Sequence, residues 1–424
     1  MKSLSSDPAP IEGYLEAGAA PLKRLAWTSA LGTLLLTGLL IPHVRDVFVA
    51  GGQRWAYILA IACVSSWTLT PWVSELGHRW GLVDVPNARK IHQTVTPRVG
   101  GLAIYPAFVL AILMNSIVTG WMVAMMVAAT ALFAIGVMDD AREVSATTKL
   151  VVHIAAASLV IASGKVLTLF PDTPLGETLN VLLTLTWIVG ITSAFNFFDG
   201  MDGLATGLAI LIAGFMGIVA FDMDQAGLGW VTVALIGACL GFLPYNLRFT
   251  KPARVFLGDS GSTFLGFTLA CLAVKGNWAD QNPIVSFSNP LLIFGVLIYD
   301  MIHITIARVA TGKVTSIHTW LEYCGKDHLH HRLENALGSR VASVFMIFGL
   351  TTCLGLAAIV LRKAGTVEAL LLLAQAAIMV AILTVLEQRG RSRKEREHVA
   401  NFLPDRPARH PSRRRGASVG PWRR

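Results

Sequence analysis

Long apolar runs alternate with short polar segments along most of the chain. Each run holds about 17–22 mainly apolar residues, enough for a helix to cross a hydrocarbon core of about 30 Å. Open sheets leave backbone groups unsatisfied in lipid, and barrels show short alternating segments. The pattern therefore predicts an all-α polytopic membrane bundle of about 11–12 transmembrane helices, with twelve candidates at 25–41, 55–73, 99–117, 120–138, 149–163, 179–195, 204–221, 228–245, 260–275, 288–307, 340–361 and 366–386.

Basic residues predict how this bundle is oriented. They concentrate in the loops that follow even-numbered runs: Arg79, Arg89, Lys90, Arg98, Arg142, Arg248, Lys251, Arg254, Arg308, Lys313, Lys326 and Arg332. The positive-inside rule places these loops and both termini in the cytoplasm. The polar clusters whose residues could take part in catalysis or metal binding follow the same helices. We therefore expect them to converge on one cytoplasmic site.

Composition agrees with a bilayer environment. Hydrophobic residues make up 54% of the 424 residues and charged residues 14%, against about 45–50% and 25% in a soluble domain. Much of the net charge of +9 lies at the C-terminus, where it suits anionic lipid headgroups better than nucleic acid. We expect an N-terminal cytoplasmic segment (1–24), a transmembrane domain (25–387) and a basic, disordered cytoplasmic tail (388–424).

Five polar segments abut apolar runs, at 84–101, 139–149, 196–205, 256–266 and 327–333. Acidic residues at membrane depth are costly and tend to be functional, although carboxylates that only reach water at a helix end are common. Asn196, Asp199 and Asp202 are spaced by three residues, so on a helix they would share one face. Such a row of oxygen ligands suits Mg²⁺.

The other clusters also allow two interpretations. Asp259 lies in GDSGS at a helix start, where free amides bind phosphate oxygens or an ordinary N-cap forms. The neighbours Asp139 and Asp140 repel each other unless a cation such as Lys149 intervenes; they could also simply end a helix. The histidines His328, His330 and His331 lack zinc-site partners and suit diphosphate or sugar binding, or a structural role.

Together, the segments LVDVPNARKIH, GG, DD, NFFDGMDGLA, FLGDSGS and HLHHRL, in this order between Gly81 and Gly338, resemble a known signature. It is that of the polyprenyl-phosphate N-acetylhexosamine-1-phosphate transferases, glycosyltransferase family 4. The histidine segment resembles most the undecaprenyl-phosphate N-acetylglucosamine-1-phosphate transferases. In the phospho-N-acetylmuramoyl-pentapeptide transferases, the alternative within the family, this segment usually has three consecutive histidines.

The resemblance implies a reaction, a metal and a set of site residues. A UDP-N-acetylhexosamine would give its sugar phosphate to polyprenyl phosphate, releasing UMP, at the inner membrane of a bacterium, with Mg²⁺ as cofactor and Mn²⁺ as a substitute. Membrane lipids are the expected partners, and a homodimer is left open. The implied metal ligands are Asn196, Asp199 and Asp259; the implied catalytic residues are Asp139, Asp140, Asp199, Asp202, Asp259, His328, His330 and His331; the implied substrate-binding residues are Lys90, His92, Lys149, Asn196 and Arg332.

Two questions stay open at this level. The acids could form the proton or cation relay of a transporter, although such charges usually lie near the mid-bilayer, often in repeated halves. The transfer could run by direct attack of the lipid phosphate, which we favour, with Asp139 or Asp140 positioning it or taking its residual proton. It could also run through a covalent sugar-phosphate enzyme on an aspartate.

Overall fold

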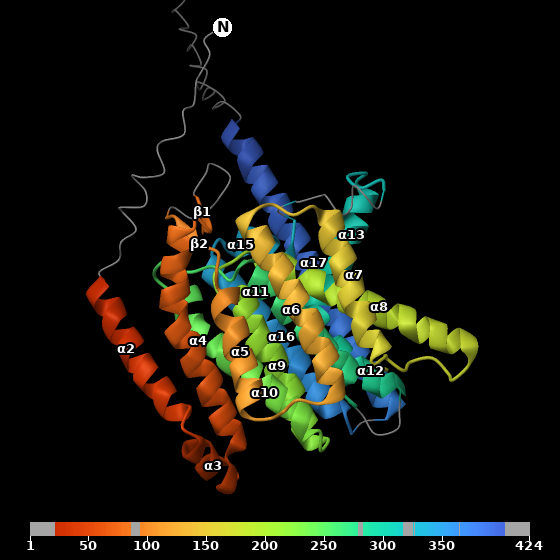
Figure 1. Ribbon diagram of the computed structural model, residues 1–424. Coiled ribbons are helices and arrows are strands. Elements are labelled where there is room, and N and C mark those ends of the chain that lie inside the picture. The colour runs from red at the N-terminus through yellow and green to blue at the C-terminus, as the bar shows by residue number, and fades with distance from the viewer. Residues whose placement is uncertain are drawn as a thin grey trace, which may run out of the picture.

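The computed structural model describes residues 22–85, 94–278, 283–316, 325, 327–363 and 365–402, and this part is almost entirely helical (Figure 1). Its helices are α2 (Leu22–Leu39), α3 (Pro42–Ala50), α4 (Arg54–Arg79), α5 (Gly101–Met114), α6 (Gly120–Ala141), α7 (Ala146–Ala162), α8 (Pro174–Phe197), α9 (Leu204–Asp222), α10 (Ala226–Asn246), α11 (Gly258–Lys275), α12 (Pro283–Ile293), α13 (Gly295–Ala310), α15 (Leu329–Leu337), α16 (Arg340–Leu361) and α17 (Thr366–Phe402). Two strands, β1 (Val83–Asp84) and β2 (Thr96–Pro97), pair antiparallel.

Each apolar run predicted from the sequence lies on a helix or on a pair of helices, which confirms a multi-pass membrane bundle. Within the described ranges, seven helices are long and apolar enough to span a membrane, or nine if two bent pairs each count as one span. This is fewer than the expected eleven or twelve because helices such as α5 and α7 are short.

The run predicted at 288–307 is broken. Helices α12 and α13 meet at an angle of 79°. Pro290 lies near the end of α12 and Gly295 opens α13. Both residue types favour an interruption, since proline removes a helical hydrogen bond and glycine is conformationally free.

The C-terminal prediction also needs correction, since helix α17 continues through the segment 388–402 that we expected to be disordered. The preceding apolar turns already form a helix, and each residue added to an existing helix gains one backbone hydrogen bond. The helix can therefore extend into the basic segment. The rest of the expected tail, 403–424, lies outside the described residues.

Helix α11 lies in the centre of the bundle. All but two of its eighteen residues are buried, and it packs against α5, α6, α8 and α9. A Cβ on Gly136 of α6 would lie 2.5 Å from the Cα of Ser260. Glycine is therefore required for α6 to approach α11 so closely, and this contact fixes the N-terminus of α11.

The short strands bring a distant loop to the same place. The Phe256 amide donates to the Pro97 carbonyl (2.8 Å), and the Gly100 and Gly101 amides donate to the carbonyls of Phe256 and Leu257. Residues 97–101 are thereby bound to the segment that leads into α11. In Figure 1, β1, β2 and α15 lie at one end of the bundle and α3 at the other.

Candidate active site

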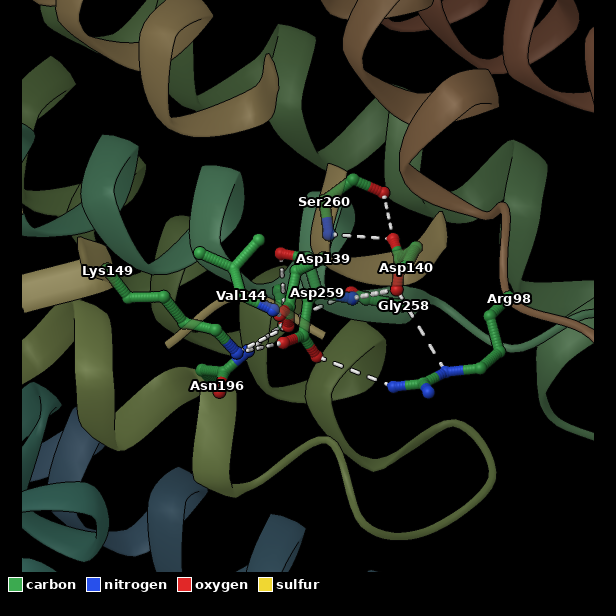
Figure 2. A network of polar contacts seen from close by, with 10 residues as sticks. Arg98, Asp139, Asp140, Val144, Lys149, Asn196, Gly258, Asp259 and Ser260 are labelled. Atoms are coloured by element: carbon green, nitrogen blue, oxygen red, sulfur yellow. Dashed lines mark hydrogen bonds and ion pairs between the residues drawn. The ribbon is translucent and has the colours of Figure 1, made fainter. Parts of the chain in front are cut away.

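The N-terminus of α11 is held by a carboxylate from another helix. Asp140, in the last turn of α6, accepts hydrogen bonds from the Asp259 amide (2.8 Å), the Ser260 amide (3.0 Å) and the Ser260 hydroxyl (2.8 Å). Figure 2 shows Asp140 turned toward these groups. The first amides of a helix have no partner within the helix and carry partial positive charge. Asp140 therefore acts as a cap supplied across the bundle.

Lys149 joins the two other carboxylates of this region. Its Nζ donates to Asp139 Oδ2 and to Asp259 Oδ2, the second bond measuring 3.0 Å (Figure 2). The other oxygen of Asp139 accepts from the Val144 amide (2.7 Å), so the turn between α6 and α7 is closed by the same residue. The structure thus brings Asp139, Asp140, Lys149 and Asp259 together, as the sequence predicted.

Arg98 belongs to this group, although in the sequence we counted it only among the residues that set orientation. Its guanidinium lies 3.9 Å from Asp140 and 3.7 Å from Asp259. Burial opposes the charge on Arg98, but Asp140 and Asp259 outweigh it and raise the pKa of Arg98. We call Asp139, Asp140, Asp199 and Asp259, with Lys149 and Arg98, the acidic cluster.

The proposed helical row of Asn196, Asp199 and Asp202 is wrong in its geometry. Helix α8 ends at Phe197, and residues 198–203 form a turn before α9. Gly203 adopts a positive φ of 74°, a conformation in which glycine is favoured and helix does not continue. The three side chains consequently do not share a helix face.

The three residues have different surroundings. Asn196 donates to the Ser262 hydroxyl of α11 (2.9 Å). Burial, followed by the charge of Asp259, raises the pKa of Asp199 well above its ordinary value. Asp202 accepts from the Ala253 amide (2.8 Å) and so fixes the loop after α10. Asn196 and Asp199 remain with the acidic cluster, while Asp202 lies against another loop.

A cavity of about 260 Å³ opens beside Asp202, between the loop after α10 and the start of α16. Three basic residues line it: Arg248, Lys251 and Arg340. Positive side chains of this kind suit anionic groups such as phosphates.

The predicted histidines gather on α15. His328 precedes this helix as its N-cap residue, and His330 and His331 lie in its first turn. Their rings are mutually close, with centroids of His330 and His331 at 4.2 Å. We call His328, His330, His331 and Arg332 the histidine cluster.

The turn after α8 connects the two clusters. The His328 ring stacks on Phe197 (5.2 Å between centroids) and the His330 ring meets Phe198 edge-on (5.7 Å). A Cβ on Gly200 would lie 2.4 Å from His330 Nε2, so only glycine leaves room for this ring. The histidines are therefore seated on the segment that also carries Asp199.

His330 is buried, with 1% of its surface exposed. Burial, and then electrostatic interaction with His331, His328 and Arg332, lower the pKa of His330 well below its usual value. Its Nδ1 is buried and has no hydrogen-bond partner among the described residues. The ring is therefore neutral at physiological pH, with one buried polar atom that lacks a partner among the described residues.

Asp300 was not singled out in the sequence, yet it lies at the base of the histidine cluster. It is fully buried in α13 and bonds His328, Leu329 and Arg332. The signal that could have found it was an acid inside an apolar run, which is expensive unless the acid has a role. Lys90 and His92 lie outside the described residues.

The donors of the acidic cluster fit a divalent cation. Asp259 and Asp199 are like charges close enough that Asp259 contributes to the raised pKa of Asp199, and a cation would relieve this repulsion. No three His, Cys, Asp or Glu side chains in the described ranges could hold a metal by themselves. Mg²⁺ typically takes only one or two carboxylates and completes its shell with water and substrate phosphates.

Comparison with known proteins gives a consistent result. Residues 122–277 match the model of glycosyl transferase family 4. This range includes the acidic cluster except Arg98, and it ends before the histidine cluster.

Several curated relatives align over most of their length. The chain is 32% identical over 315 residues to the probable undecaprenyl-phosphate N-acetylglucosaminyl 1-phosphate transferase of Bacillus subtilis (strain 168), covering 73% of this chain and 85% of that protein. It is 31% identical to the decaprenyl-phosphate N-acetylglucosaminephosphotransferase of Mycobacterium leprae (70% and 81% covered). It is 28% identical to the undecaprenyl-phosphate alpha-N-acetylglucosaminyl 1-phosphate transferase of Escherichia coli K12 (66% and 76%). With its acids and cations assembled at the start of a central helix, the chain belongs to glycosyl transferase family 4.

Proposed function

We propose that this protein transfers N-acetylglucosamine 1-phosphate from UDP-N-acetylglucosamine to undecaprenyl phosphate. The products are UMP and the lipid-diphosphate-sugar that begins a cell-envelope polysaccharide. The names of the three relatives, all N-acetylglucosamine phosphate transferases acting on a polyprenyl phosphate, support this choice. The observation that carries it is the acidic cluster, in which Lys149 and Arg98 meet Asp139, Asp140 and Asp259 beside a helix N-terminus.

The main obstacle to this reaction is electrostatic. The acceptor is a phosphomonoester with a second pKa of about 6, so it is mostly dianionic at neutral pH and hardly needs a base. It must approach a diphosphate that is also negative. The side chains of Lys149 and Arg98 would reduce this repulsion.

The two neighbouring aspartates take different roles in this proposal. Both oxygens of Asp140 are engaged by groups at the start of α11, so Asp140 positions that helix. Asp139 is held by one amide and by Lys149. We therefore assign to Asp139, and not to Asp140, the role of orienting the lipid phosphate or taking its residual proton.

A magnesium ion fits the proposal, with Mn²⁺ as a substitute. Asp259 and Asp199 would hold it, and Asn196, whose NH₂ group donates to the Ser262 hydroxyl of α11, would add its amide oxygen. When bound, the ion neutralises diphosphate charge and aligns the in-line displacement. Arg98 and Lys149 would orient the phosphates of the substrates.

The donor binds, in this proposal, between the two clusters. Lys149 and Arg98 of the acidic cluster would contact its diphosphate, and the basic cavity beside Asp202, lined by Arg248, Lys251 and Arg340, offers a separate place for anionic groups. The distribution of basic loops supports a cytoplasmic position for this site, which we assign to a bacterial inner membrane. That is the side on which nucleotide-sugars would be available.

The test is a transfer assay with purified protein in detergent. Undecaprenyl phosphate and radiolabelled UDP-N-acetylglucosamine are incubated with Mg²⁺ or with EDTA, and UMP and labelled lipid are both measured. We expect equal amounts of the two products with Mg²⁺ and neither with EDTA. Labelling only from UDP-N-acetylgalactosamine or from UDP-N-acetylmuramoyl-pentapeptide would correct the sugar, whereas no labelling from any donor by folded protein would refute the proposed reaction.

A further inference from the structure

Asp300 is an acid that the proposed reaction does not use directly. It lies in α13, the half-helix that follows the 79° bend, and none of its surface is exposed. Removing a carboxylate from water costs several kcal/mol unless it is paired and hydrogen-bonded. Its partners therefore indicate what it does.

The hydrogen bonds of Asp300 to other described residues all reach one short segment, 328–332. Its Oδ2 lies 2.8 Å from His328 Nδ1, and its Oδ1 accepts from the Leu329 amide at 2.7 Å. Arg332 Nη2 approaches Oδ1 at 3.4 Å. The side chain of His328 does not cap α15. Asp300 supplies that cap from a separate helix while it holds the His328 ring.

These contacts determine which ring nitrogen of His328 carries the hydrogen. An ionised carboxylate has no proton to donate, so Nδ1 is the donor in the bond to Asp300. In the neutral ring, Nε2 is then an acceptor. A carboxylate behind a histidine fixes both its tautomer and its orientation in this way.

The ring is also held from its faces. His328 stacks on Phe197 with an interplanar angle of 28° and on His330 with an angle of 12°. Phe197 ends α8 immediately before the turn that carries Asp199. The plane of the His328 ring is therefore set relative to the acidic cluster, and its hydrogen is set by Asp300.

We propose that Asp300 is a positioning residue for transfer: it holds His328 with Nδ1 protonated, so that Nε2 accepts a hydrogen bond from a hydroxyl or amide N–H of the bound nucleotide-sugar. This inference rests on the proposed function for the identity of the ligand. The placement of the hydrogen rests on the contacts of Asp300 alone.

The decisive variant is Asp300→Asn. The asparagine oxygen still accepts from the Leu329 amide, but its NH₂ group donates to His328 Nδ1 and forces the opposite tautomer. We expect kcat to fall about 10²-fold, the scale found when the partner that orients a functional histidine is lost. The KM for UDP-N-acetylglucosamine should change much less, and the thermal unfolding temperature should stay close to that of the wild type.

A double-mutant cycle tests whether Asp300 acts through His328. If it does, Asp300→Asn combined with His328→Gln loses no more activity than the worse single variant. Asp327→Asn is the matched control, because Asp327 anchors the same segment to Arg308 (2.7 and 2.9 Å). Its effect should add to that of His328→Gln. Full additivity for Asp300→Asn would overturn the inference.

Nitrogen-15 NMR of histidine-labelled protein in lipid provides a readout that does not depend on activity. We assign the His328 signal by its loss in His328→Gln, and we expect Nδ1 protonated in the wild type, Nε2 protonated in Asp300→Asn and no change in Asp327→Asn. An Nε2-protonated neutral ring in the wild type overturns the inference even if Asp300→Asn fails to fold. A wild type that transfers no sugar phosphate refutes the proposed function instead, while an active wild type with an equally active Asp300→Asn variant refutes only the role of Asp300.

Discussion

The acidic cluster and the histidine cluster are joined by the turn after α8, and they are held in place differently. In the acidic cluster, Asp139, Asp140 and Asp259 share two cations and several backbone amides, and the helices beneath them meet at glycines. The histidine cluster depends on one buried carboxylate, Asp300, and on ring stacking. The first is held by many shared charges, whereas the second has fewer anchors, Asp300 and the Asp327–Arg308 ion pair.

This difference suggests a division of labour. Phosphate groups need strong, fixed charges, which a preorganised cluster supplies without rearrangement. A sugar needs hydrogen bonds of defined direction, which a ring with one fixed tautomer can supply. The variants below test this division, from the largest expected effect to the smallest.

Replacing Asp259 with asparagine should remove the central charge of the acidic cluster. We expect the initial rate of lipid labelling to fall about 10³-fold or more, since electrostatic groups aimed at the reacting centre contribute effects of this size. The unfolding temperature should fall, because Lys149 and Arg98 lose a carboxylate partner, and relief of the repulsion from Asp199 offsets only part of this loss. Asp172→Asn, at an exposed loop position, is the control and should behave as wild type. A fully active Asp259→Asn would show that transfer does not need the charge of the acidic cluster.

Gly136→Ala should disturb the acidic cluster through packing alone. The new Cβ would meet the Ser260 backbone at 2.5 Å and force α6 away from α11, with an expected stability loss of about 1–3 kcal/mol. We expect activity to fall about tenfold to a hundredfold, as for loss of a supporting contact. Gly214→Ala in α9 is the matched control, because a Cβ there meets nothing within 4 Å. An unchanged unfolding temperature for Gly136→Ala would show that this contact can relax.

Acidification should act on the histidine cluster through His330. Its pKa is lowered in the folded protein by burial and neighbouring positive charge, so the unfolded state binds more protons below the ordinary value of about 6.5. Stability should therefore be full above that pH and should be lost as the pH falls toward the lowered pKa. Unfolding temperatures between pH 8 and 5 test this, and His330→Gln should flatten the slope; an equal slope in both proteins would assign the effect to another group.

Asp202→Asn should have the smallest effect. The asparagine oxygen can still accept from the Ala253 amide, so the loop after α10 keeps its anchor. We expect less than about tenfold loss of transfer activity, within the range of a neutral hydrogen bond to an otherwise intact loop. A loss as large as that of Asp259→Asn would return Asp202 to the catalytic group that its spacing in the sequence suggested.

The sequence predicted the helices well because each membrane-spanning helix consists of a contiguous apolar run. It also predicted which acids would meet, since Asp139, Asp140 and Asp259 all follow runs that end on the same side. The turn at 198–203 was mistaken for a helix because spacing by three is ambiguous without knowledge of the Gly203 conformation.

Contacts between distant segments could not be derived in this way. Arg98 reaches the acidic cluster because residues 97–101 form hydrogen bonds with the segment before α11. The local sequence does not indicate that these two segments pair. Asp300 was detectable as an acid in an apolar run, but its partners were not. The roles of the predicted site residues stay predictions until the variants are measured.

The dependence of α11 on Asp140 also has a consequence for biogenesis. The two bonded residues are 119 positions apart, so α6 leaves the ribosome and enters the membrane well before its partner is made. During that interval the carboxylate of Asp140 lacks the amides that later surround it, and it must remain hydrated at the membrane surface. The acidic cluster therefore cannot assemble until α11 has been made, and a chain truncated before α11 would insert into the membrane without acquiring this cluster.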